Sequence, residues 1–126
     1  RTQAGANERT TLRTARAPSL TGLEQWMQTM LAHGASREMI LRAAQEQESW
    51  LENECTIAFN RALAVHNLKN AYGSFVTEEK LKELKAFIER SLEQGMSPER
   101  IIAHLVEAEW NTKFISEYVR AYAVKP

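Results

Sequence analysis

The chain has 126 residues, a formal net charge of zero and a hydrophobic share of 44%. This length fits one compact domain or two very small ones, and the hydrophobic share is ordinary for a globular protein. A balanced net charge argues against a chain that coats nucleic acid or an anionic membrane with its whole surface.

The single cysteine, Cys55, cannot form an intramolecular disulfide. We therefore expect a reducing compartment, the cytoplasm, rather than a disulfide-stabilised secreted scaffold. The apolar runs are too short for a transmembrane segment, and the N-terminus lacks the apolar core of a signal peptide. Because the chain begins with Arg1, it fits a processed form or the soluble domain of a larger membrane-associated assembly.

Residues 1–18 are predicted to form a flexible, disordered basic tail. Leu12 is their only large aliphatic residue, so they cannot bury enough apolar surface to offset the entropy of ordering. One interpretation is a linker. The other is a basic arm, residues 1–16, that contacts nucleic acid through its arginines: Arg1, Arg9, Arg13 and Arg16.

A first three-helix repeat is predicted over residues 19–71. Thr21 and Glu24 have capping-box spacing, so a helix should begin at Thr21. Gly34 fits the left-handed position that ends a helix, and Ser36 fits the cap of the next one. The apolar residues of these two helices recur with helical spacing: Leu23, Trp26, Met27, Met30, Leu31, Ile40, Leu41 and Ala44.

The segment around Ser49 allows two interpretations. Ser49 and Glu52 form a second capping-box pattern, which would start a separate third helix. No Gly or Pro interrupts residues 37–71, however, so the second and third helices could also be one long rod. We favour the break, which places these residues on the inward face of the third helix: Leu51, Cys55, Ala58, Phe59, Ala62 and Leu63.

Asn, Gly and Ser cluster at residues 70–74, which predicts a loop between two halves. A second three-helix repeat follows over residues 75–124. Thr77, Ser97 and Asn111 are suitable N-caps, Pro98 suits the first position of a helix, and Gly95 suits a helix end. The predicted core of this repeat comprises Leu81, Leu84, Phe87, Ile88, Leu92, Ile101, Ile102 and Leu105. Four residues of its last helix align with Cys55, Ala58, Phe59 and Ala62 of the first repeat: Ile115, Tyr118, Val119 and Tyr122.

The two repeats align along most of their length. Gly34 corresponds to Gly95, and the apolar positions of the first helix fall on those of the fourth, with Met30 against Ser91 as the one mismatch. One residue is gained before Trp50, which then corresponds to Trp110. The sequence therefore predicts an all-α fold of two tandem three-helix units with about six helices, which could pack as one domain.

At the second repeat the chain resembles the ubiquitin-associated (UBA-like) three-helix domains, over roughly residues 79–122. The resemblance lies in Gln94-Gly95-Met96 after an amphipathic helix, and in Ile115-Ser116-Glu117-Tyr118-Val119 in the last helix. It implies a small three-helix bundle that binds a protein partner through the first corner and the end of the third helix. The matching residues here are Gly95, Met96, Val119 and Tyr122.

Residues with reactive side chains are sparse. His33, His66 and His104 do not have the spacing of a metal site, which needs three or four converging ligands. Cys55 falls on an apolar helix face and is interpreted as a buried hydrophobic residue. We expect no catalytic residue, cofactor or metal, and an acidic run is interpreted as a solvated helix face: Glu46, Glu48, Glu52 and Glu54.

The sequence favours a non-enzymatic protein–protein interaction or adaptor module, which binds a protein partner or forms a homo-oligomer through apolar helical patches. The three tryptophans, Trp26, Trp50 and Trp110, are interpreted as core residues. A nucleic-acid-associated protein that uses the tail is the alternative. The candidate contact surface consists of Gly95, Met96, Tyr118, Val119 and Tyr122.

Overall fold

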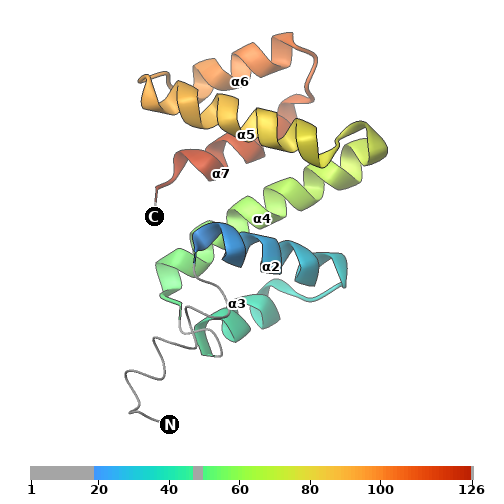
Figure 1. Cartoon of the computed structure of the whole chain (residues 1–126), viewed down its shortest axis with the longest axis vertical. Helices are drawn as coiled ribbons and strands as arrows, with labels where there is room; N and C mark the ends of the chain where they lie inside the picture. Colours follow the sequence, from blue (N-terminus) through green and yellow to red (C-terminus); the bar gives the residue numbers. More distant parts are fainter. Residues whose placement is uncertain (1–18, 47–49, 126) are drawn as a thin grey trace. The chain divides into compact units, whose positions relative to one another are not determined.

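The computed structural model describes residues 19–46 and 50–125, and within them it is all-α, as predicted. A short 3₁₀ helix, Gly73–Phe75, follows the longest α-helix. The predicted basic tail, residues 1–18, lies outside the described residues. Figure 1 labels the six α-helices: α2 (Leu20–Ala32), α3 (Arg37–Glu46), α4 (Glu52–Tyr72), α5 (Glu78–Glu93), α6 (Pro98–Glu107) and α7 (Thr112–Ala123).

The chain divides into two compact units between Ala62 and Leu63, within α4. The first unit holds α2, α3 and the beginning of α4, and the second unit holds the rest of α4 with α5, α6 and α7. The sequence places the boundary later, in the loop at residues 70–74. The difference arises because the end of α4 contributes three buried residues to the core of the second unit: Ala64, Val65 and Leu68.

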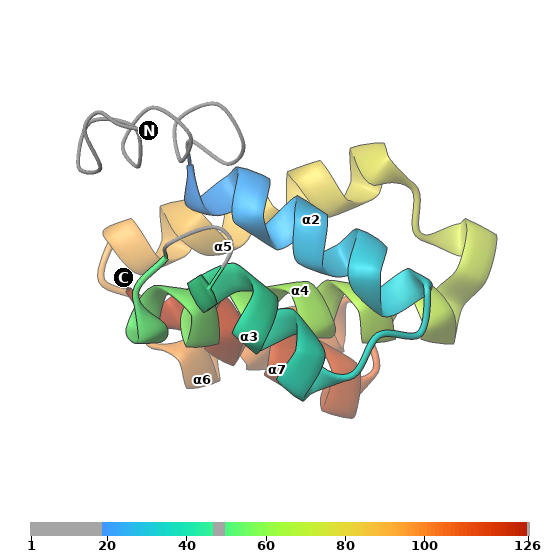
Figure 2. The same ribbon diagram turned by 90° about the horizontal axis from the view of Figure 1, so that it is seen from below.

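In the first unit, a tight corner joins α2 to α3 (Figure 2). Gly34 adopts a φ of 86°, the left-handed conformation that a Cβ disfavours. The Gly34 N–H donates to Leu31 O at 3.0 Å, and the Ala35 N–H donates to Met30 O at 3.0 Å. These two bonds form a Schellman motif, which satisfies the last carbonyl groups of α2. The predicted helix end at Gly34 is confirmed.

The start of α2 differs from the prediction. Ser19, rather than Thr21, is the N-cap, and its Oγ accepts a hydrogen bond from the Gly22 N–H at 3.1 Å. Glu24 therefore lies too far into the helix to complete a capping box. Its side chain is buried instead.

α3 and α4 are separate helices, which resolves the two interpretations in favour of the break. Trp50 and Leu51 are not helical, and the Trp50 N–H donates to Ala44 O at 3.2 Å. The Leu51 N–H donates to the Glu54 carboxylate at 3.0 Å, which is the reach-back half of a capping box. The predicted pair of Ser49 and Glu52 is therefore replaced by Leu51 and Glu54. Ser49 lies outside the described residues.

The buried apolar residues that the first unit contributes come from all three of its helices and from Trp50. Trp26 and Met30, predicted in this core, are only partly buried. Leu51, also predicted to point inward, is exposed because it precedes the first turn of α4. The buried set comprises Leu23, Met27, Ile40, Ala44, Trp50, Cys55, Ile57, Ala58, Phe59 and Ala62.

The second unit repeats the corner of the first. Gly95 has a φ of 89°, its N–H donates to Leu92 O at 3.0 Å, and the Met96 N–H donates to Ser91 O at 3.0 Å. Ser97 caps α6 through a bond from the Arg100 N–H at 3.2 Å, and Pro98 occupies the first turn. The capping roles predicted for Thr77 and Asn111 are also confirmed.

The connection from α6 to α7 forms another Schellman motif without a glycine. Glu109 is left-handed, with a φ of 76°, and its N–H donates to Val106 O at 3.0 Å. The Trp110 N–H donates to Leu105 O at 3.1 Å. Trp50 bonds to Ala44 in the same way, and Ala44 is the residue that aligns with Leu105. In the sequence, one more residue separates Ala44 from Trp50 than separates Leu105 from Trp110.

The core of the second unit draws on all of its α-helices. Trp110 packs against it at an edge-to-face angle of 73° to Tyr72, with the ring centroids 5.4 Å apart. The Tyr72 hydroxyl also accepts a hydrogen bond from the Asn111 N–H at 2.7 Å. The buried set comprises Ala64, Val65, Leu68, Val76, Leu81, Leu84, Ile88, Ile101, Ile102, Leu105, Ile115, Tyr118, Val119 and Tyr122.

Candidate interaction surface

Three of the five residues predicted to bind a partner are core residues. Tyr118, Val119 and Tyr122 are between 0% and 5% exposed and belong to the apolar cluster of the second unit. The UBA-like resemblance implied binding through Val119 and Tyr122, and the helical spacing of all three residues places them on the inward face of α7. Gly95 is exposed, and Met96 is partly buried against the same cluster.

The two tyrosines are held by their neighbours. Their ring centroids lie 5.0 Å apart, and the Lys85 ammonium group lies 5.5 Å from the centre of the Tyr122 ring. Such packing of α5 on α7 is what a three-helix core requires. As the structure stands, the contact surface predicted in the second unit is reduced to Gly95 and the exposed part of Met96.

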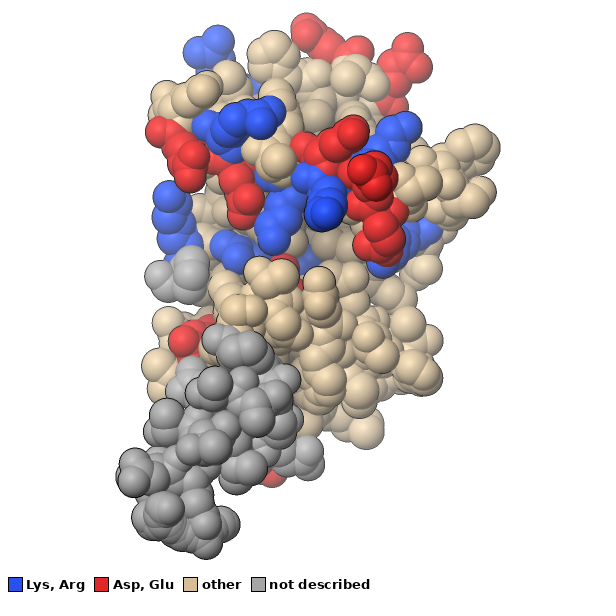
Figure 3. Space-filling view, in the orientation of Figure 1, with Lys and Arg blue, Asp and Glu red and all other residues tan. Residues whose placement is uncertain are grey.

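A different surface stands out in the first unit, on α2. This helix contains one charged residue, Glu24, and that residue is only 3% exposed. Every α2 side chain that reaches the surface is therefore uncharged. Figure 3 shows uncharged side chains over α2 and a mixture of both charges over α5. Depletion of charge, with aromatic residues and Met retained, is the composition that marks the centre of a protein–protein interface.

Four of the α2 residues that reach the surface lie within about 100° of one another around the helix, with exposed Gln25 beside them. Gly22, Trp26, Thr29 and Met30 follow at spacings of four, three and one, so a rotation of about 100° per residue places them on one side. We call these four residues the α2 stripe. Thr29 is exposed, and the other three are partly buried. Trp and Met are side chains that form large, adaptable contacts.

The positions of α5 that align with the α2 stripe include charged residues. Glu83, Phe87, Arg90 and Ser91 stand where the α2 stripe has its four residues, so two uncharged positions become charged. The rest of α5 is also rich in charge. The surface of α5, the helix that aligns with α2, is therefore an ordinary charged surface. A helix before a glycine corner does not need an uncharged surface such as that of α2.

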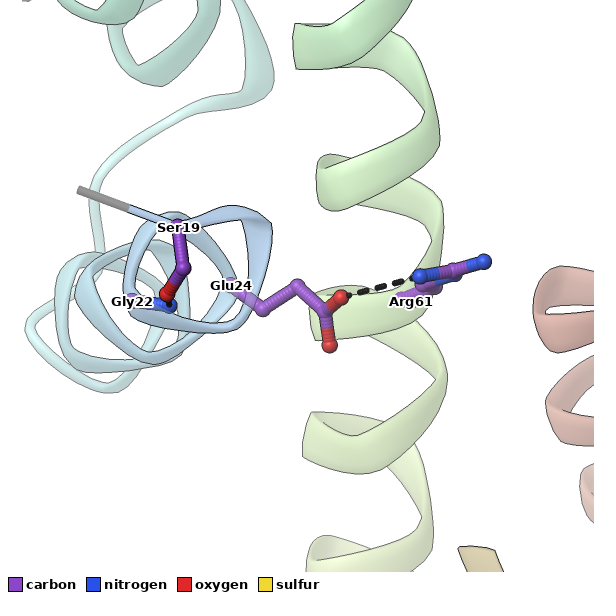
Figure 4. Close-up of polar contacts among 4 residues, drawn as sticks. All are labelled: Ser19, Gly22, Glu24 and Arg61. Atoms are coloured by element: carbon purple, nitrogen blue, oxygen red, sulfur yellow. Dashed lines mark hydrogen bonds and ion pairs between the residues drawn. The ribbon is translucent and has the colours of Figure 1, made fainter. Parts of the chain in front are cut away.

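Glu24 connects α2 to α4. Its Oε2 lies 3.2 Å from Nη1 of Arg61, and the two side chains are 4% and 12% exposed (Figure 4). Burying the only carboxylate of α2 against an arginine removes a charge from the surface and adds a polar contact between α2 and α4. Sequence reasoning assigned Glu24 to a cap and missed this pair. The available signal was the position of Glu24 between Leu23 and Met27, on the apolar face.

Two histidines of the described residues make local hydrogen-bond contacts within their own helices or helix ends. His33 Nδ1 lies 2.8 Å from Thr29 O, and His66 Nε2 lies 3.1 Å from the Asn70 side-chain amide. Cys55 is fully buried, as expected. Across residues 19–46 and 50–125 no three His, Cys, Asp or Glu side chains gather closely enough to hold a metal ion.

Comparison with protein families, curated proteins and solved structures finds no match. The resemblance to UBA-like domains therefore stays a prediction. Among the described helices, none combines the length and the apolar character needed to cross a membrane.

Proposed function

We propose that this chain is a non-enzymatic interaction module that joins protein chains through the surface of α2. The observation that carries the proposal is the contrast between aligned helices: α5 exposes charges of both signs, and α2 exposes none. An uncharged surface with a half-exposed Trp26 and Met30 loses little hydration free energy when a partner covers it.

A duplicated three-helix motif is part of the proposal. Its support is the shared backbone pattern: both first corners are Schellman motifs closed by an aligned glycine, and Trp50 and Trp110 bond to aligned carbonyl groups. If the second unit is UBA-like, Gly95 and Met96 remain at its surface for a second, weaker contact. A cytoplasmic location is proposed on the evidence of the single, buried cysteine.

The alternative functions stay predictions. Nucleic-acid binding was assigned to residues 1–16, which lie outside the described residues, and no described feature favours it. Membership of a membrane-associated assembly likewise stays a prediction.

Affinity capture tests the proposed function. The immobilised chain should retain protein from the lysate of its native host, and Thr29→Arg should abolish the retention by placing a charge in the α2 stripe. Gln28→Arg is the matched control, because residue 28 lies about 160° around the helix from both Trp26 and Met30 and its side chain reaches the surface. Circular dichroism should be the same for all three proteins. Retention that survives Thr29→Arg would place the binding surface elsewhere and refute the proposed role of α2.

A further inference from the structure

We draw no further inference here: the strongest candidate, the uncharged surface patch that α2 presents around Trp26 and Met30, belongs to the site already described, and nothing in the structure shows what covers it.

Discussion

Each of the two units has a helix–helix corner with the same backbone geometry. The units differ in where the charged side chains of their first helix lie. Both end their first helix at a left-handed glycine with the same two backbone hydrogen bonds. In the first unit the aligned charge, Glu24, is buried against Arg61. In the second unit, Lys85 stands at that position and lies over the ring of Tyr122. One backbone arrangement thus supports a surface without charge in one unit and a highly charged surface in the other.

The largest expected effect comes from breaking the buried pair. Glu24→Ala removes the carboxylate that Arg61 contacts, and we expect a loss of about 3 kcal/mol in the free energy of unfolding. Lys85→Ala, at the aligned position, should cost less than about 1 kcal/mol, because Lys85 is partly exposed. Urea denaturation followed by circular dichroism measures both.

Replacing both members of the pair provides the control for this prediction. The double variant Glu24→Leu with Arg61→Leu should recover most of the stability that Glu24→Ala loses, because apolar residues of similar size can replace a buried ion pair. A double variant as unstable as Glu24→Ala would show that the pair is needed for more than its mutual contact.

Next in size are the two corner glycines. Gly34→Ala and Gly95→Ala should each lower the free energy of unfolding by about 1 kcal/mol, since a Cβ disfavours a left-handed backbone. No atom lies within 4 Å of the added Cβ at either position, so backbone conformation alone sets the cost. Thermal denaturation should give nearly equal losses. A loss several times larger in one unit would contradict the equivalence of the corners.

A gain of similar or slightly smaller size is expected at the third Schellman motif. Glu109 is the only non-glycine residue with positive φ among those described. Glu109→Gly should raise the free energy of unfolding by up to about 1 kcal/mol, because the glycine adopts this conformation without the steric cost. Glu109→Ala is the matched control: it removes the same carboxylate, keeps the Cβ and should bring no such gain.

The smallest effect concerns the cap of the last helix in each unit. Asn111 accepts hydrogen bonds from the Lys113 and Phe114 N–H groups, whereas Leu51 precedes α4 with a side chain that cannot cap and is 61% exposed. Leu51→Asn should stabilise the chain by about 0.5 kcal/mol and Asn111→Leu should destabilise it by about 1 kcal/mol. Urea denaturation should give a higher free energy of unfolding for Leu51→Asn and a lower one for Asn111→Leu. Changes in the same direction would contradict the comparison.

The sequence predicted the helices and the corners well because those depend on local chemistry. Gly34 and Gly95 required a left-handed backbone, and Ser97, Pro98 and Asn111 each had a capping preference that no distant residue overrode. Thr21 was predicted as a cap because its spacing to Glu24 fits a capping box equally well. Only tertiary contact with Arg61 shows why Glu24 is there.

The candidate surface was harder to predict. The helical spacing of apolar residues identifies an apolar face, but it does not show whether another helix covers that face. Tyr118, Val119 and Tyr122 are apolar residues on one face of α7, and α7 packs against α5 and α6. The uncharged surface of α2 was visible in the sequence as a helix with one acidic and no basic residue. The sequence does not show that this residue, Glu24, is buried, and only its burial leaves the surface of α2 without charge.

The position of the division within α4 has a practical consequence for anyone who wishes to study one half of the molecule. A fragment that starts at Gly73, where the sequence suggests a boundary, would lack Ala64, Val65 and Leu68 and so would expose the apolar surface they cover. Such a fragment is expected to aggregate or stay unfolded when expressed. A fragment of the second half should therefore begin no later than Leu63, and it should keep the last part of α4.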